Sequence, residues 1–321
     1  PVLLPVDRWI YSRLNGAART LSAAFEGYRF NDAAITAYEY FWNDFCDWYV
    51  EATKLSIRAG DDAEKDRATT VLLDVLSESL KLLHPLIPFV TEEIYAKLPA
   101  ECKRSGNVEL PLERKRKGNV ELLITARYPA WDPERDDPEG EGRFAFLQDL
   151  VRRIRTCRSE CTVTPDKQLR ASVTVGGGGG NGGEAALRAA FLKENAALVK
   201  LLAGLGELAV QSGGEAAGAG TAGGANGGAA HPVPAGAVVL AGADFQALLF
   251  IGEAVDLAAL KAKFEKNLSK DKQFIRGLEA KIANPDFVKN APAELVEGEK
   301  QKLAEARERT GKIESYLRGL A

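Results

Sequence analysis

The sequence has few of the residues on which most catalytic and metal sites depend. Its 321 residues include no Met, two His and four Cys, and no two of the cysteines form a Cys-x-x-Cys pair. Zinc sites draw their ligands from closely spaced Cys and His, so we expect no metal site. We expect the thiols to be reduced, as in a cytoplasmic protein. The lack of Met suggests a piece of a longer chain.

Long apolar runs and a secretory leader are also missing. No apolar stretch is long enough to cross a bilayer, and the first residues lack the basic flank and apolar core of a signal peptide. The net charge of −3 reveals little about partners, because a small negative total can conceal local basic surfaces. Binding properties must therefore be sought in local features.

The residues available for nucleophilic or acid–base chemistry form no recognisable set. His84 and His231 each precede a proline, and the place of His84 after an apolar run favours a structural role at a helix end. The glycine-rich run at 176–183 lacks the Lys and the Ser or Thr that complete a phosphate-binding loop. We predict no catalytic centre in this chain.

Residues 1–142 are predicted to form a helical domain. Apolar residues recur there at spacings of three and four, as in a helical bundle. The expected helices are 7–25, about 32–52, 63–83 and 89–98. Asp7 and either Asn31 or Asp32 are the expected N-caps, and Gly27 the expected end of the first helix. A repeated Gly-Asn-Val-Glu-Leu at 106–110 and 118–122 predicts a hairpin, and the acidic segment 132–141 is interpreted as a linker.

Residues 143–252 are expected to form a small α/β module. Helices are predicted at 144–160 and 184–202, and strands at 169–175, 208–211, 238–240 and 245–251. The Gly/Ala tracts at 176–183 and 213–230 are interpreted as flexible surface loops.

Residues 253–321 have the pattern of two long helices joined by a turn. Apolar residues recur at three and four from Leu257 to Ile282 and again from Val296 to Leu317, and prolines interrupt the pattern between them. This predicts an antiparallel coiled-coil hairpin, with arms roughly 40 Å long at 1.5 Å per residue.

Two cationic surfaces favour an interaction with nucleic acid. The predicted helix 144–160 places Arg152 and Arg155 on one stripe with Arg153 beside them, and guanidinium groups bind phosphates bidentately. The first arm of the hairpin also carries an excess of lysines over acidic residues. The alternative for both is a solvated helix face that makes surface ion pairs. Aromatic residues between Tyr38 and Tyr49 could stack on bases, but at helical spacing they are more often core.

Three stretches resemble the valyl-tRNA synthetase family. The first comprises residues 7–15, 28–34 and 41–51, and its Phe-Trp-Asn-Asp-Phe-Cys-Asp-Trp-Tyr points to valine among the class I synthetases. The second is Leu-Leu-His-Pro-Leu-Ile-Pro-Phe-Val-Thr-Glu-Glu-Ile-Tyr at 82–95, and the third lies at the predicted hairpin turn, at 284–288 and 291–296. The middle of the chain departs from the family pattern at the Gly/Ala tracts and the 106–122 repeat.

The resemblance implies a mainly α protein: a helical anticodon-binding bundle, a small α/β connector and a C-terminal coiled-coil arm that rests against the outer corner of valine tRNA. The implied anticodon-binding candidates are Arg29, Phe30, Asn31, Trp42 and Asn43. The implied candidates for contacts with the tRNA backbone are Arg152, Arg153, Arg155, Arg158, Lys261, Lys263, Lys266, Lys270 and Arg276. Neither DNA nor a membrane is an expected partner, and the chain is expected to be a cytoplasmic monomer.

The family's ATP-handling signatures, His-Ile-Gly-His and Lys-Met-Ser-Lys-Ser, are absent from the sequence. The resemblance therefore implies that a full-length enzyme attaches valine to its tRNA with ATP, whereas this chain holds no cofactor and is inactive alone. One alternative is the same region of an isoleucine or leucine synthetase, against which the terminal arm argues. Another is a coiled-coil adaptor with a protein partner, whose binding would depend much less on salt.

Overall fold

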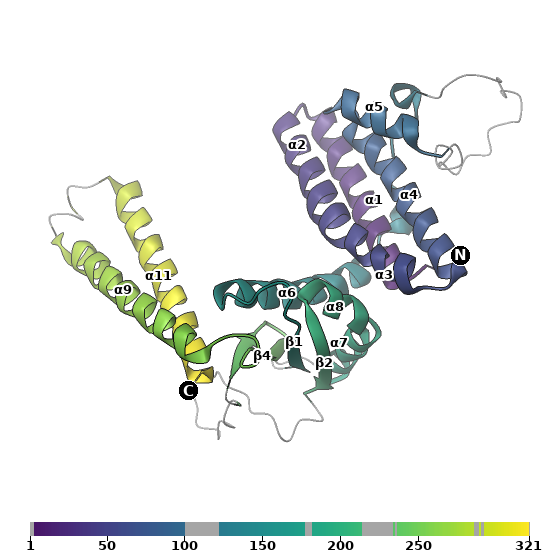
Figure 1. Ribbon diagram of the computed structural model, residues 1–321. Coiled ribbons are helices and arrows are strands. Elements are labelled where there is room, and N and C mark those ends of the chain that lie inside the picture. The colour runs from purple at the N-terminus through teal and green to yellow at the C-terminus, as the bar shows by residue number, and fades with distance from the viewer. Residues whose placement is uncertain are drawn as a thin grey trace, which may run out of the picture. The chain divides into compact units, whose positions relative to one another are not determined.

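The computed structural model describes residues 3–99, 122–176, 182–213, 234, 236–285, 289 and 292–320 (Figure 1). The chain is mainly helical, with one four-stranded sheet and a terminal helix pair, which confirms the predicted fold class. It divides into two compact units, Pro1–Phe146 and Leu147–Ala321. The predicted hairpin at 106–122, the two Gly/Ala tracts and the turn of the terminal hairpin lie almost entirely outside the described residues.

The first unit is a bundle of long helices. These are α1 (Pro5–Glu26), α2 (Phe30–Tyr38), η1 (Glu39–Val50), α3 (Glu51–Ala59), α4 (Asp62–Leu83) and α5 (Pro88–Lys97). In Figure 1, α2, α1 and α4 lie side by side. The segments α2, η1 and α3 follow one another without a break, and η1 is a π-helix of 12 residues. π-Helical turns are rare and often occur at functional sites.

Two predicted N-caps of this bundle were wrong. Asp7 lies inside the first turn of α1, where its Oδ2 accepts a hydrogen bond from the backbone N of Leu4, the actual N-cap, at 2.9 Å. Tyr28 has a positive φ of 54°, so the chain turns within two residues and α2 already begins at Phe30. This early start leaves Asn31 and Asp32 inside the helix. The predicted stop at Gly27 is confirmed.

A buried polar cluster connects three of the helices. Asp7 is only 2% exposed, and its Oδ1 accepts a hydrogen bond from the hydroxyl of Tyr49 at 2.9 Å. Arg67 Nε lies 3.2 Å from Asp7 Oδ2, which is an ion-pair distance, although its geometry is not that of a hydrogen bond. Removing one member of a buried pair leaves the other charge without compensation. The register of α1, η1 and α4 therefore depends on one carboxylate.

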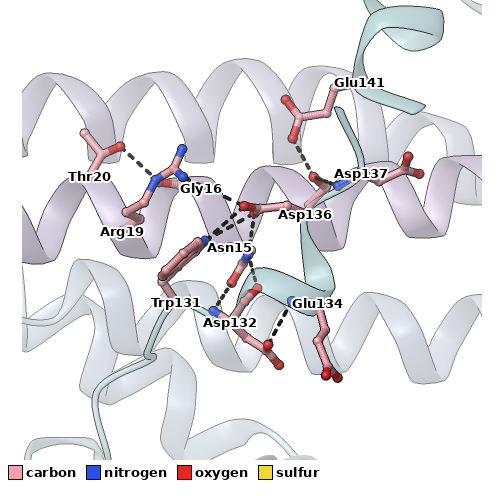
Figure 2. Close-up of polar contacts among 11 residues, drawn as sticks. Asn15, Gly16, Arg19, Thr20, Trp131, Asp132, Glu134, Asp136, Asp137 and Glu141 are labelled. Carbon is pink, nitrogen blue, oxygen red and sulfur yellow. Dashed lines mark hydrogen bonds and ion pairs between the residues drawn. The ribbon is translucent and has the colours of Figure 1, made fainter. Parts of the chain in front are cut away.

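The segment 131–141 is attached to α1, so its interpretation as a linker was wrong (Figure 2). Asn15 donates to the carbonyl of Asp132 at 2.7 Å and to Asp136 Oδ1 at 2.6 Å, and accepts from the backbone N of Asp132 at 2.9 Å. One turn earlier, Ser12 Oγ accepts from the backbone N of Asp137 at 2.9 Å. The acidic composition suggested solvation, whereas these carboxylates and carbonyls bind polar side chains of α1.

The second unit contains a mixed sheet. Its elements are α6 (Pro138–Glu160, which begins in the first unit), β1 (Leu169–Val175), α7 (Gly182–Glu194), α8 (Ala196–Ala203), β2 (Leu205–Ser212), β3 (Ala237–Ala241) and β4 (Phe245–Phe250). The strand order is β2-β1-β4-β3, with β1 parallel to β2 and antiparallel to β4. The single helix predicted at 184–202 is two helices, because Asn195 interrupts it and donates to the carbonyl of Phe191 at 2.8 Å.

The terminal helices α9 (Leu257–Ala283) and α11 (Ala293–Gly319) pack together as the predicted hairpin. Ion pairs cross between them, including Arg309 to Asp271 at 2.7 Å and Lys272 to Glu314 at 2.8 Å. At the base of the pair, Glu160 of α6 accepts hydrogen bonds from Lys312 and from the Tyr316 hydroxyl, both at 2.7 Å. The arm is thereby attached to the end of α6.

Replacing Asp7 tests the buried cluster. We expect Asp7→Asn to lower the free energy of unfolding of the first unit by about 3–5 kcal/mol, because the substitution leaves Arg67 buried without its counter-charge. All four tryptophans (9, 42, 48 and 131) lie in this unit, so their fluorescence in a urea titration reports its unfolding. The control is Asp61→Asn at the N-cap of α4, where Asn caps as well as Asp. An equal effect of the two substitutions would contradict the assignment.

Acid should weaken the arm. The hydrogen bond and charge of Arg309 hold the pKa of Asp271 below its usual value. A lowered folded-state pKa stabilises the arm above the usual aspartate pKa of about 4, and this contribution is lost as the pH falls through the lowered pKa. We expect the protection of the α9 and α11 amides from hydrogen exchange, measured relative to the intrinsic rate at each pH, to fall in that range, and Asp271→Asn to reduce this pH dependence. An unchanged profile in the variant would show that other groups are responsible.

Candidate nucleic-acid interface

One face of the α2–η1 helix exposes large apolar side chains. Tyr28 is 80% exposed and Trp42 53%, and the side chains between them on this face are similarly open. We call this surface the aromatic stripe; it consists of Tyr28, Phe30, Ile35, Tyr38 and Trp42. Contiguous exposed apolar surface on a protein commonly marks an interaction site.

The four rings of the aromatic stripe pack against one another in two pairs. Tyr38 and Trp42 are one helical turn apart and stack with centroids 6.3 Å apart and planes 6° apart. The ring of Phe30 lies 6.3 Å from that of Tyr28, edge to face. Such rings offer planar surfaces on which an unstacked base can stack, whatever its sequence.

Four other aromatic residues of this segment belong to the core. Tyr40, Phe45, Trp48 and Tyr49 are each at most 5% exposed, and the Tyr40 hydroxyl lies 2.9 Å from Ser79 Oγ. The core interpretation therefore holds for these four residues, whereas Tyr38 and Trp42 are exposed on the opposite face, and base stacking there stays a prediction. Tyr28 and Tyr38 were not among the residues predicted for the site. The spacing of Tyr38 four residues before Trp42 could have indicated it.

Four of the five anticodon-binding candidates lie on this helix and Arg29 is its N-cap, but the five do not form one cluster. Arg29, Phe30 and Asn31 are exposed at its start, and Arg29 pairs with Asp32 at 3.1 Å. Trp42 and Asn43 are exposed in η1, roughly 18 Å further along at 1.5 Å per residue.

The arginines of α6 differ in their surroundings. Arg152 is exposed, Arg153 is exposed and pairs with Asp149 at 2.8 Å, and Arg155 donates to the carbonyl of Leu202 at 2.7 Å. Arg158 is 9% exposed and donates to three carbonyls, those of Gly204, Thr164 and Lys167, at 2.8–3.1 Å. Burial lowers the pKa of Arg158. These bonds give Arg158 a structural role, in which it joins α6 to the loop before β1 and to the start of β2.

The first arm helix carries cations that are not engaged in ion pairs within the described part of the chain. We call them the arm cations: Lys261, Lys266, Lys270 and Arg276, all exposed. Lys263, also a candidate, donates to the backbone carbonyl of Glu160 at 3.2 Å. Sequence analysis did not single out Phe274, which is 48% exposed in a shallow groove beside Lys270.

Comparison with known proteins gives two family matches along the chain. Residues 7–174 match the anticodon-binding domain of tRNA ligase, and residues 256–321 match the valyl tRNA synthetase tRNA binding arm. The chain belongs to the valyl-tRNA synthetase family. It contains the family's anticodon-binding domain and tRNA-binding arm, and the alternative origin in an isoleucine or leucine synthetase is therefore wrong.

Curated valine–tRNA ligases are similar along nearly the whole chain. The enzyme of Treponema denticola is 42% identical over 99% of this chain, that of Treponema pallidum 36% over 98%, and that of Geobacter sulfurreducens 34% over 93%. The chain spans only 29–31% of the length of these relatives.

Within the described ranges, no group of three or more His, Cys, Asp or Glu side chains could hold a metal ion. No helix in the same part of the chain is both long and apolar enough to cross a membrane.

A pair of tryptophan substitutions separates the two faces of the α2–η1 helix. Trp42→Ala should change the free energy of unfolding by less than about 1 kcal/mol because the side chain is half exposed, yet should weaken RNA binding about tenfold. Trp48→Ala, at a position 5% exposed, should cost about 3–5 kcal/mol of stability. Urea titration and RNA titration measure the two effects. Equal losses of stability would show that Trp42 is also core.

Proposed function

We propose that this chain is the tRNA-recognition part of a valine–tRNA ligase and that its partner is valine tRNA. The observation that carries the proposal is the occurrence of both matched families in one chain. The segment of each match exposes a surface suited to RNA: the aromatic stripe in the first and the arm cations in the second.

The aromatic stripe would read the anticodon loop. Loop bases are unstacked and expose their edges, so proteins recognise them by stacking and by edge hydrogen bonds. In this role Phe30 and Trp42 stack on bases, while Arg29, Asn31 and Asn43 bond to base edges or nearby phosphates. The exposure of all five side chains supports this assignment.

The second unit would hold the tRNA backbone. The arm cations, with Lys263 and the exposed Arg152, Arg153 and Arg155, would contact phosphates and so add affinity without sequence choice. We do not assign Arg158 to this surface, because its guanidinium is buried among carbonyls. We propose residues 1–142 as the anticodon-binding part, 143–252 as a connector and 253–321 as the arm.

Valine attachment with ATP would belong to the full-length enzyme, a cytoplasmic monomer, and this chain alone would not aminoacylate. The chain covers about 30% of its relatives, and the sequence lacks the ATP-handling signatures. An adaptor with a protein partner is the competing function.

The direct test is a titration of the chain with valine tRNA and with the same tRNA carrying a changed anticodon, at two salt concentrations. We expect tighter binding to the valine anticodon, weakened as salt rises. Equal binding to both RNAs that weakens with salt would support binding to tRNA in general, without recognition of the anticodon. Absence of binding would favour the adaptor.

The arm cations should set part of the salt dependence. Lys266→Ala combined with Lys270→Ala should lower the slope of log K against log salt by about 1–2, because up to two phosphate contacts are lost. Discrimination between anticodons should not change. The control is Lys272→Ala, two residues after Lys270, whose amine already pairs with Glu314 at 2.8 Å. A similar fall in slope for the control would contradict the assignment.

A further inference from the structure

Hydrogen bonds join the arm to the rest of the second unit at separate points along α11. At the end of this helix, the carbonyl of Gly319 accepts from the backbone N of Gly236, the residue before β3, at 3.2 Å. Earlier in the helix, Lys312 and Tyr316 both donate to the carboxylate of Glu160, the last residue of α6, at 2.7 Å. A rod held at one point can pivot, whereas a second point at a distance from the first fixes its direction.

Glu160 binds both helices of the arm. Its carboxylate accepts from α11, and its backbone carbonyl accepts from Lys263 of α9 at 3.2 Å. The rings of Phe264 in α9 and Tyr316 in α11 lie next to each other, with centroids 5.6 Å apart. Glu160 therefore holds the helix pair as a unit and not one helix alone.

The Tyr316 hydroxyl makes the stronger of the two contacts with the carboxylate. Tyr316 is 2% exposed and burial raises its pKa, so the hydroxyl keeps its proton and donates to Glu160. A hydrogen bond to an ionised acceptor is roughly twice as strong as one between neutral groups. The side chains of Lys312 and Glu160 are 43% and 36% exposed, and ion pairs at such positions contribute little. The side-chain attachment of the arm therefore depends chiefly on Glu160 and Tyr316.

The length of the arm amplifies any movement at its base. At 1.5 Å per residue, Lys312 lies roughly 10 Å along α11 from Gly319, and Ala293 at the far end lies roughly 40 Å from it. A shift of 1 Å at Lys312 would thus move the far end by about 4 Å. Hydrogen-bond distances vary by only about 0.5 Å, so contacts made by the outer part of the arm require a fixed base.

The two arm helices are held to each other by contacts of their own. Ion pairs cross between them, as from Arg307 to Glu279 at 2.7 Å, and the pair buries apolar side chains of both helices. Loss of the Glu160 contacts should therefore free the direction of the arm without unfolding it.

We propose that Glu160 is a positioning residue, whose carboxylate fixes the direction of the arm so that the arm cations reach the tRNA backbone together. This role rests on the function proposed above. The affinity that the arm cations add would depend on Glu160, although Glu160 itself would touch no RNA. An arm that is free to swing must be ordered when it binds, and this ordering lowers the affinity.

The test compares Glu160→Gln with Glu314→Gln in the whole chain. Both substitutions remove one carboxylate charge, but Glu314 pairs inside the arm, with Lys272 at 2.8 Å. Tyr316→Phe is a second variant, which removes only the hydroxyl and keeps the ring beside Phe264. Amide hydrogen exchange in the middle of α9 and α11 checks that the arm stays folded in each variant.

The first readout is the direction of the arm without RNA. Spin labels replace two exposed residues, Glu207 of β2 and Glu294 near the far end of α11, and pulsed electron resonance measures the distances between them. We expect a narrow distribution in the native chain and in Glu314→Gln, and one broader by roughly 4 Å or more in Glu160→Gln and Tyr316→Phe. Equally narrow distributions in all four proteins would overturn the assignment of Glu160.

The second readout is titration with valine tRNA at two salt concentrations. Loss of a carboxylate should by itself favour RNA binding, and Glu314→Gln should therefore bind no more weakly than the native chain. We expect Glu160→Gln to weaken binding about threefold or more and to lower the slope of log K against log salt by about 1, because contacts of the arm cations are lost.

In a chain that already carries Lys266→Ala and Lys270→Ala, Glu160→Gln should cost much less affinity, because the changes act on the same contacts. An equal loss with and without the two lysines would show that Glu160 does not act through them, and would overturn its role while tRNA binding stands. If valine tRNA does not bind the native chain, the proposed function fails and the role of Glu160 in RNA binding fails with it.

Discussion

The buried carboxylate of Asp7 is the constraint on which the first unit depends. A charge at this depth is unfavourable unless it is compensated, and here a backbone N–H, the Tyr49 hydroxyl and the guanidinium of Arg67 compensate it. These three partners come from the start of α1, from η1 and from α4. Satisfying one carboxylate therefore sets the positions of three helices, and those positions decide which side chains of η1 point inward.

This inward packing also determines which side chains the α2–η1 helix exposes on its other face. With Tyr40 bonded to Ser79 of α4 and Tyr49 to Asp7 of α1, Tyr38 and Trp42 lie on the other face and are 62% and 53% exposed. Two stacked aromatic rings are costly to leave in water unless a partner covers them for part of the time. The packing that stabilises the bundle thus also presents the surface that we assign to RNA.

The sequence predicts the elements of this fold well because each is long and strongly periodic. Most helices of the bundle, strand β1 and both arm helices lie within a few residues of their expected ranges. The exception is the second helix, expected to end near residue 52, which continues through α3 to Ala59. The errors arose where tertiary contacts decide local structure. Tyr28 at a positive φ advanced the start of α2, and Asn15 turned an apparent linker into part of the bundle. A composition rule cannot foresee either, since both depend on a partner distant in sequence or on one residue's conformation.

The site was predicted less completely, for a related reason. Residue type identified the arginines of α6, but only burial separates Arg158, bound to three carbonyls, from Arg152 and Arg153 on the surface. A cavity of about 400 Å³ in the first unit could not be expected from the sequence, because its lining comes from residues 81–88 and from residues 123–128, some 40 positions later. Helical periodicity reports which face of an element is apolar, not which two elements leave a space between them.

The division of charge on the arm bears on how the two units would share recognition. Cations such as Arg309, Arg307 and Lys272 are neutralised across the helix pair and hold it together. The arm cations are not, so their charge remains available to phosphates at little cost in arm stability. Because phosphates are the same in every tRNA, this surface can add affinity but cannot distinguish one tRNA from another. Under the proposed function, selection among tRNAs would come from the first unit, where the exposed aromatic rings would meet bases that differ from one tRNA to another.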